Sequence, residues 1–336
     1  MKIFVVCTKT IVSFWEKIAS IFDVNILGIS NYSLLINAKY YKNDKSVSCP
    51  YIKNINGLYQ WKLPSNTLII FDEVHKCCNP HTYCGKLLLG LRDVYCEKIP
   101  LLLLSATICE SPSKFKLYGV LLKWYDHYNN ADHWLDPEYN PVVASKIIHD
   151  KLTKTNVICG IKIRELGDQF QKNTICSEYF DLEKSNANQI DKLYDQIKKN
   201  IKELTNNESK CNFVLCTKEM QKIELLKINL FIDLANEYLE NNFSVIIFVN
   251  FKETLRILAN ELKTNCIISG GQPLKERLDN INKFVKDKER IIICNIHTGG
   301  DSISLNDKYG KYKRVSLISP TWSAIKLIQA CGRNCR

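Results

Sequence analysis

Two adjacent carboxylates, Asp72 and Glu73, directly follow the apolar run of residues 67–71. An apolar run without polar alternation predicts a strand that is buried on both faces, as in a parallel sheet. The two acids would then lie at the carboxyl edge of that sheet, where α/β folds bind their ligands. Neighbouring carboxylates in different environments can divide the chemistry, because one can hold a cation while the other takes a proton from water. Nucleotide hydrolysis requires that division.

Alternating strands and helices must position this acidic pair. In residues 1–125, apolar runs predict strands at 3–7, 24–29, 67–71 and 100–104. Amphipathic or polar-flanked segments predict helices at 13–22, 32–36, 81–92 and 113–124. Strand–helix alternation of this kind is typical of a doubly wound parallel sheet.

The same alternation returns in residues 218–336. Helices are predicted at 219–241, 251–262 and 273–285, and strands at 244–249, 266–269, 290–294 and 315–318, followed by a final helix. Between the two α/β regions, residues 126–217 show a weaker pattern with one long polar helix at 185–204. We therefore expect an α/β protein with two doubly wound domains, 1–125 and 218–336, and a partly helical insertion or linker at 126–217.

Composition limits the class of protein and its partners. The 336 residues carry a formal charge of +11, from 46 basic and 35 acidic side chains. That excess suits a polyanion such as nucleic acid, although a lysine-rich solvated surface is the alternative. The opening apolar run is too short for a signal peptide, and no stretch is long enough to span a membrane. The fifteen scattered cysteines form no disulfide framework, which indicates reduced thiols in the cytoplasm.

One cluster of metal-ligating residue types follows the acidic pair. It consists of Cys77, Cys78, His81, Cys84 and Cys96. Their spacing matches no standard pair of C-x-x-C arms, so structural thiols are the alternative to a zinc site.

The chemistry-bearing residues of the first domain resemble two motifs of the superfamily 2 helicases. The segment Asp72-Glu73-Val74-His75 looks like their Walker B or DEXH element. The next apolar strand ends in Ser105-Ala106-Thr107, which resembles the element that couples hydrolysis to movement between the lobes. Because both strands would end at one edge, the hydroxyls of Ser105 and Thr107 should lie close to the acidic pair. The resemblance also assigns His75 to this coupling.

The second domain resembles the remaining motifs in the family's order. Residues 291–305 resemble motif V, in which the resemblance assigns Thr298 to nucleic acid and Gly299, Gly300 and Asp301 to the nucleotide. Residues 329–336 resemble motif VI, which contains Gln329, Gly332, Arg333 and Arg336.

Spacing on a helix would place Gln329, Arg333 and Arg336 on one face. Two guanidiniums there suit a phosphate cluster, since each presents a rigid fork of donors. The alternative is a basic helix end that is favourable to the helix dipole.

Longer segments narrow the resemblance to the Swi/Snf-related helicases of phages and large DNA viruses. These segments are 71–91, 101–124, 245–258 and 314–333. Residues 4–15 resemble motif Ia, whose Thr8 and Lys9 would touch the nucleic-acid backbone. The resemblance implies two RecA-like lobes, ATP and Mg²⁺ as cofactors, and DNA or RNA as partner; it covers 126–217 only loosely.

The chain also departs from the family. No G-x-x-x-x-G-K-[ST] phosphate loop occurs in the 336 residues, and Gly85-Lys86 lacks both the upstream glycine and the following hydroxyl. The sequence starts at motif Ia and stops at Arg336 within motif VI, as though truncated. We therefore expect little ATPase activity from this chain alone, with a phosphate loop supplied by an upstream polypeptide. Ser302 stands where relatives often carry glycine.

The favoured interpretation is an ATP-dependent helicase or translocase core. Asp72 would hold Mg²⁺, and Glu73 would orient and deprotonate the attacking water. Arg333 and Arg336 would act as arginine fingers, assisted by Gln329. The alternatives are an ATPase-dead nucleic-acid-binding fragment, one part of a split helicase, or a structural relic.

Overall fold

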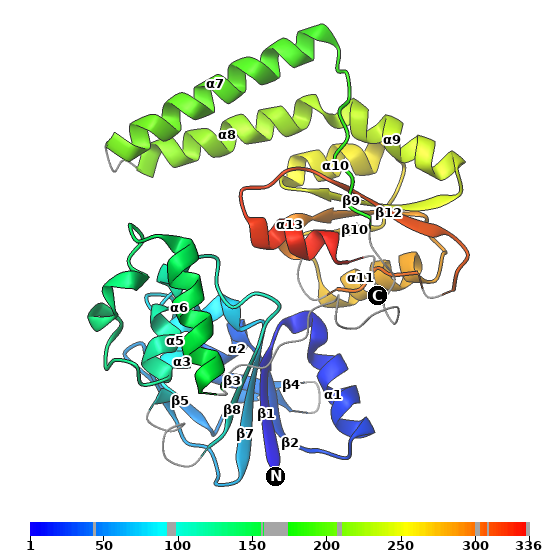
Figure 1. Ribbon diagram of the computed structural model, residues 1–336. Coiled ribbons are helices and arrows are strands. Elements are labelled where there is room, and N and C mark those ends of the chain that lie inside the picture. The colour runs from blue at the N-terminus through cyan, green and yellow to red at the C-terminus, as the bar shows by residue number, and fades with distance from the viewer. Residues whose placement is uncertain are drawn as a thin grey trace. The chain divides into compact units, whose positions relative to one another are not determined.

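The computed structural model divides the chain into two compact units, residues 1–161 and 162–336 (Figure 1). It describes residues 1–42, 45–92, 99–155, 157, 174–206, 210–299, 303–307 and 309–333. Both units are α/β and each contains parallel strands, as the alternating pattern predicts. Among the described residues, no helix is long and apolar enough to cross a membrane.

A six-stranded sheet forms the centre of the first unit. Its strands are β1 (Lys2–Cys7), β2 (Asn25–Asn31), β3 (Lys39–Lys42), β4 (Lys45–Ser48), β7 (Thr67–Asp72) and β8 (Leu101–Leu104). They lie in the order β4-β3-β2-β1-β7-β8. Strands β2, β1, β7 and β8 are parallel, and β3 and β4 add an antiparallel edge. The register pairs Val6 of β1 with Phe71 of β7, so both strands end at the same edge.

Helices cover both faces of this sheet. On one face α1 (Val12–Ile21) packs over Val5, Cys7 and Ile70. The larger core on the other face includes Phe4 and Phe71. The helices that contribute to it are α2 (Tyr32–Leu35), α3 (Tyr83–Leu89), α5 (Lys116–Leu121) and α6 (Pro141–Lys154). The short 3-10 helices are η1 (Lys9–Ile11), η2 (Val74–Cys77), η3 (Pro112–Phe115), η4 (Tyr128–Asn130) and η5 (His133–Leu135).

The strands between residues 39 and 61 were not predicted. Besides β3 and β4, this segment forms a separate hairpin of β5 (Ile52–Ile55) and β6 (Leu58–Trp61). Asn56 and Gly57 connect the two strands with φ values of 52° and 82°. A pair of left-handed residues is what a tight type I′ hairpin turn needs, and Asn-Gly is its strongest sequence signal. That dipeptide could have identified the hairpin.

The strand predicted at residues 100–104 is present as β8, but the apolar run also predicts that it is buried, and this is wrong. β8 lies at one edge of the sheet among the described residues, and Leu102 is 42% exposed. An apolar run cannot by itself distinguish a central strand from an edge strand, because the neighbouring element decides the burial.

The second unit contains a four-stranded parallel sheet. Its strands are β9 (Phe243–Val249), β10 (Ile267–Ile268), β11 (Ile291–Asn295) and β12 (Lys313–Ile318), in the order β10-β11-β9-β12. Helices α9 (Ile228–Glu240) and α10 (Lys252–Glu261) pack on one face. The other face is covered by residues of α11 (Leu274–Val285), α12 (Ile296–Gly299) and α13 (Ala324–Cys331).

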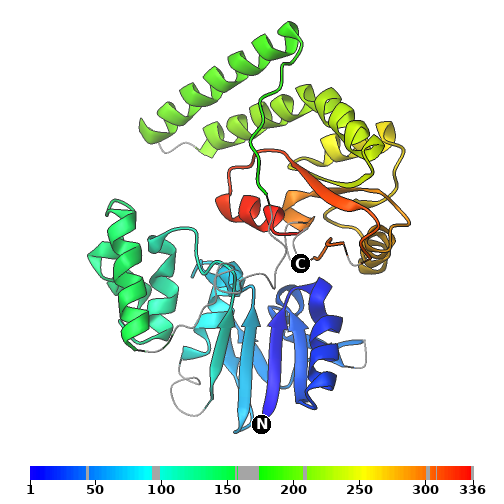
Figure 2. The same ribbon diagram turned by 45° about the vertical axis from the view of Figure 1, so that its right-hand side comes forward.

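A helical hairpin precedes this sheet. Helices α7 (Lys184–Asn206) and α8 (Lys210–Leu226) lie side by side (Figures 1 and 2) and share a small apolar core that includes Ile190, Ile197 and Ile223. The predicted helix at 185–204 is confirmed by α7. The single helix predicted at 219–241 is wrong, because α8 ends at Leu226 and α9 begins at Ile228.

The base of the hairpin is fixed to the second sheet by a buried carboxylate. Glu224 of α8 accepts hydrogen bonds from the backbone N–H groups of Asn250 and Phe251, with shortest distances of 2.9 and 3.1 Å. It also accepts one from the Asn250 side-chain amide at 2.8 Å. These donors satisfy a carboxylate that burial would otherwise destabilise. The hairpin and the loop between β9 and α10 are therefore joined directly.

Candidate functional site

The acidic pair lies at the carboxyl end of β7, as the apolar run predicts. Asp72 is the last residue of the strand, and Glu73 turns the chain into η2 with φ 57° and ψ 46°. A residue with a Cβ atom in this left-handed region carries strain of order 1–3 kcal/mol. Such strain persists at sites where the direction of a side chain matters. The two adjacent carboxylates have different partners, Trp15 for Asp72 and His75 for Glu73.

Asp72 is held at both its side chain and its backbone. Its Oδ2 accepts a hydrogen bond from Nε1 of Trp15 at 3.0 Å, and its carbonyl oxygen accepts one from the Tyr32 hydroxyl at 2.8 Å. Burial raises the pKa of Asp72, and the Trp15 hydrogen bond opposes that rise. The carboxylate is therefore kept in one place in surroundings that disfavour its charge.

Burial raises the pKa of Asp72. The stability of the first unit should therefore fall as pH rises through the range in which Asp72 ionises. Asp72→Asn should therefore stabilise this unit at neutral pH, by about 0.5–2 kcal/mol as for other stabilising substitutions. The advantage should shrink in mildly acidic solution, where wild-type Asp72 is protonated. Thermal unfolding at both pH values measures this, with the exposed Glu138→Gln as control. A less stable Asp72→Asn protein at neutral pH would contradict the prediction.

The structure brings the predicted coupling residues together. Nδ1 of His75 lies 3.0 Å from Oγ of Ser105 and 3.2 Å from Oε2 of Glu73. The Ser105 hydroxyl donates to the Thr107 carbonyl at 2.6 Å and accepts from the Thr107 backbone N–H at 3.3 Å. One histidine thus connects the acidic turn after β7 with the loop after β8. Oγ1 of Thr107 is buried and has no hydrogen-bond partner in the part of the chain that is described.

A second connection between the same two loops was not predicted from sequence. The hydroxyl of Tyr118, in α5, donates to the carbonyl oxygens of Val74 and Ile108 at 3.0 and 3.2 Å. Burial raises the pKa of Tyr118, so the phenol stays protonated and can donate. A tyrosine in an apolar helix gives no sequence signal for this role, because ordinary core packing produces the same pattern.

The predicted nucleic-acid contacts of the first unit lie at the same sheet edge. Thr8 and Lys9 directly follow β1, which is parallel and adjacent to β7. Lys9 is exposed, and Thr8 is half-buried with its hydroxyl 3.3 Å from that of Thr10. Lys9 is therefore accessible to a phosphate.

Thr298 and Gly299 are in α12, immediately after β11. A Cβ atom on Gly299 would lie 2.6 Å from Cβ of Cys294, so packing inside the unit already requires glycine at this position. Gly300, Asp301 and the neighbouring Ser302 lie outside the described residues. The nucleotide contacts predicted for this loop stay predictions.

Two further residues lie next to Thr298 and were missed from the sequence. A Cβ atom placed on Gly270 would lie 3.6 Å from Oγ1 of Thr298 and 3.9 Å from Nζ of Lys252. A hydroxyl, an ammonium group and the half-buried backbone of Gly270 therefore converge after β9, β10 and β11. The signal that could have found Lys252 is its position at the first residue of a helix after a buried strand.

The helix predicted to carry Gln329, Arg333 and Arg336 on one face is wrong. α13 ends at Cys331, and Gly332 at its C-cap leads the chain out of the helix. Arg333 is only 8% exposed, and its Nη1 donates to the carbonyl oxygen of Ile303 at 3.1 Å. Gln329 is buried in α13, and neither polar atom of its side chain is hydrogen-bonded within the described residues. Arg336 lies outside them.

Packing requires glycine at position 299, but neither packing nor backbone conformation requires it at position 332. The φ of Gly332 is −85°, and the nearest atoms to an added Cβ are 3.6 Å away, so a larger residue would fit in the second unit. Gly332 is also exposed. Its predicted place near a nucleotide is therefore compatible with the structure, and packing does not explain it.

The thiol cluster after the acidic pair does not form a metal site among the described residues, which hold no group of three or more potential ligands. Cys77 is fully buried, and burial raises its pKa well above the usual range. Cys96 lies outside the described residues.

Two parallel-sheet units, with an acidic pair at one sheet edge, define a two-domain RecA-like protein. Residues 222–336 match the family described as the helicase conserved C-terminal domain. The chain is 36% identical over 360 residues to a protein of Acanthamoeba polyphaga mimivirus named as a candidate ATP-dependent RNA helicase, covering 98% of this chain and 67% of that protein. The chain belongs to the superfamily 2 helicases.

The fold agrees with this assignment. The structure of Saccharomyces cerevisiae Dbp5 bound to RNA and ADP BeF3 matches with a TM-score of 0.51 and 12% identity, over 99% of this chain and 68% of that one. The prediction of an α/β protein with two RecA-like lobes is confirmed.

Proposed function

We propose that this chain is the motor core of a helicase or translocase that uses ATP hydrolysis to move along, or to unwind, DNA or RNA. The observation that supports this best is the His75–Ser105 contact of 3.0 Å. It joins the acidic turn, where hydrolysis would occur, to the loop that resembles the family's coupling element. A nucleotide-dependent change at Glu73 could therefore reach the β8 loop through one side chain.

Asp72 and Glu73 would perform different parts of the hydrolysis. The half-buried Asp72 carboxylate fits Mg²⁺, because it is a hard oxygen donor and forms no ion pair with a described lysine or arginine. When bound, Mg²⁺ would neutralise charge on the phosphate oxygens. Glu73, whose partner is His75, would orient the attacking water and accept its proton.

Arg333 and Arg336 would stabilise the charge that develops on the transferred phosphoryl group. Arginine fingers contribute roughly 10³–10⁵ to the rate in related nucleotide hydrolases. To act in this way, Arg333 would have to exchange its contact with the Ile303 carbonyl for a phosphate oxygen. Exposed Gly332 would let a phosphate approach the backbone beside it.

Phosphates of the nucleic acid would bind at Thr8 and Lys9 on the first unit, and at Thr298 and Lys252 on the second. We expect Lys9→Gln and Lys252→Gln each to weaken binding of single-stranded oligonucleotides of any sequence. Each should make the negative slope of log K against log salt less steep by about 0.7, because each lysine releases one counterion when it binds a phosphate. Fluorescence anisotropy at several salt concentrations measures the slope, and an unchanged slope in both variants would contradict these contacts.

The missing phosphate loop determines how the function must be tested. Since the 336 residues contain no G-x-x-x-x-G-K-[ST], we expect them to hydrolyse ATP at close to the background rate. A segment that carries this loop, joined ahead of Met1 or added as a separate polypeptide, should restore hydrolysis stimulated by nucleic acid. Full activity without that segment would contradict the proposal of a supplied phosphate loop. A different outcome would be salt-sensitive binding of nucleic acid that ATP does not change, whether or not the phosphate-loop segment is present. That outcome would favour a nucleic-acid-binding fragment without ATPase activity.

The cytoplasm of a host cell is the compartment we propose. Eleven cysteines of the described residues are free thiols, and several are buried in the two cores. Thiols persist in a reducing environment.

A further inference from the structure

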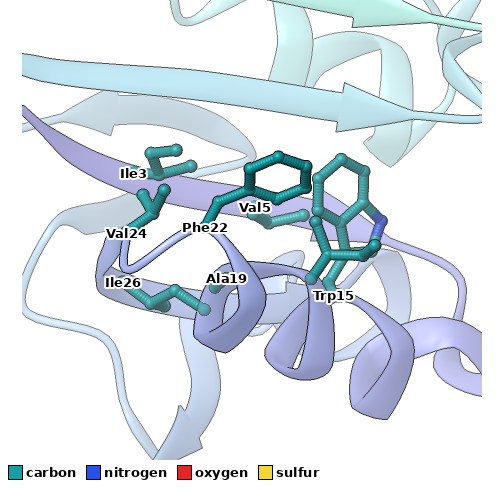
Figure 3. Close-up of a pocket in the computed structure, with 8 residues that line it drawn as sticks. Ile3, Val5, Trp15, Ala19, Phe22, Val24 and Ile26 are labelled. Carbon is teal, nitrogen blue, oxygen red and sulfur yellow. The ribbon is translucent and has the colours of Figure 1, made fainter.

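Trp15 contacts both the apolar packing of α1 and the acidic pair. Its rings lie against a pocket lined by Ile3, Val5, Ala19 and Phe22, and Figure 3 shows the indole nitrogen on the side turned away from Phe22. That nitrogen donates the 3.0 Å hydrogen bond to Oδ2 of Asp72. Packing therefore fixes the ring, and the ring fixes one carboxylate oxygen.

The same helix begins at the predicted nucleic-acid contact. η1 contains Lys9 and leads without a gap into α1, whose first turn ends at Trp15. Ile11 and Trp15 are four residues apart and pack in the same apolar cluster as Val5 and Ile70. Because only helical residues separate Lys9 from Trp15, a displacement of the backbone at Lys9 has a short path to the Trp15 indole.

A neutral donor suits the position beside Asp72. An arginine or lysine there would cancel the charge that a cation needs, whereas an indole N–H orients the carboxylate and leaves its charge intact. A change in the indole position would then change the direction of the carboxylate.

We propose that Trp15 is a positioning residue that links nucleic-acid binding at Thr8 and Lys9 to the Asp72 carboxylate. This inference rests on the proposed function, since it needs a phosphate at Lys9. A bound phosphate fixes η1, the start of α1 and the indole, and thereby holds Asp72 in the orientation that hydrolysis uses.

Thermodynamic linkage between nucleic-acid binding and the state of Asp72 allows the inference to be tested without measuring ATP hydrolysis. If binding at Lys9 and the state of Asp72 are coupled, changing Asp72 must change the affinity for nucleic acid. We expect Asp72→Ala to change the Kd of the full chain for a labelled single-stranded oligothymidylate by about fivefold or more, the lower end of usual coupling. In a Trp15→Phe background, which keeps an aromatic ring and removes the N–H, the same change should have little effect.

Trp61→Phe is the matched control. Trp61 also donates a 3.0 Å hydrogen bond from a buried indole in the first unit, but to the Leu87 carbonyl. In that background the effect of Asp72→Ala on the Kd should remain. Asp72→Asn replaces Asp72→Ala if the alanine variant does not fold.

Nuclear magnetic resonance provides a direct readout. The chain has five tryptophans, and Trp15→Phe identifies the Trp15 indole signal by its loss. That signal should shift on Asp72→Asn and again when the oligothymidylate binds, whereas the Trp61 signal should not move. Equal effects of Asp72→Ala with and without Trp15, or oligonucleotide binding that leaves the Trp15 signal unmoved, would overturn the inference alone. Wild-type chain that shows no salt-sensitive binding would overturn the nucleic-acid role itself.

Discussion

Glu73→Gln should lower the rate of ATP hydrolysis by about 10²–10⁴-fold, the contribution usual for a positioned general base. Glutamine has almost the same shape as glutamate but cannot accept the proton of the attacking water. Because Glu73 lies in a strained turn and its shape is kept, binding of ATP and of nucleic acid should change little. The measurement is steady-state hydrolysis by the chain supplied with a phosphate-loop segment, together with separate binding assays.

The exposed Glu110 provides a control in the same unit, after the loop that contains Ser105. Glu110→Gln should leave the rate unchanged, since this side chain is exposed and pairs with Lys114 on the surface. If Glu73→Gln hydrolysed ATP at the wild-type rate, another group would have to be the base. Loss of ATP binding in this variant would instead indicate a structural role for Glu73.

Arg314→Met should destabilise the second unit by about 3–5 kcal/mol, the usual cost of leaving one charge of a buried ion pair without its partner. Arg314 and Asp287 are 2.6 Å apart, and their side chains are only 2% and 4% exposed. Arg314 also lies over the ring of Phe284, which Met can partly replace. Urea unfolding followed by circular dichroism measures the loss.

Lys198 and Asp195 form the matched surface pair, at 72% and 74% exposure on α7. Lys198→Met should cost less than about 0.5 kcal/mol, because solvent screens exposed pairs. Adding Asp287→Asn to Arg314→Met should recover part of the loss, since no uncompensated charge then remains buried. If Lys198→Met and Arg314→Met lowered the free energy of unfolding by the same amount, this account would be contradicted.

Sequence reasoning found the parts of the fold that depend on apolar periodicity. β7, β9 and β11 are continuous apolar runs, and the acidic pair lies where the end of β7 predicts. Ser105 lies near the acidic turn, as expected because parallel strands end at one sheet edge, although its contact there with His75 was not foreseen.

The errors arise at positions where local backbone geometry or long-range packing, and not apolar periodicity, determines the structure. The hairpin at Asn56-Gly57 depends on two left-handed residues, and the end of α13 depends on Gly332, which helix periodicity ignores. The Trp15 and Tyr118 hydrogen bonds join residues 57 and 44 positions apart in the chain, and no local pattern reports such pairs.

The buried Glu224 connects the α7–α8 hairpin to the backbone that precedes Lys252. Since its carboxylate binds the backbone of Asn250 and Phe251, a force applied to the hairpin reaches the residue directly before Lys252. Twisting this arm should therefore turn the Lys252 ammonium group relative to Thr298. A dye attached to an exposed position of α7 would report this turn and would test whether it accompanies the proposed binding of nucleic acid.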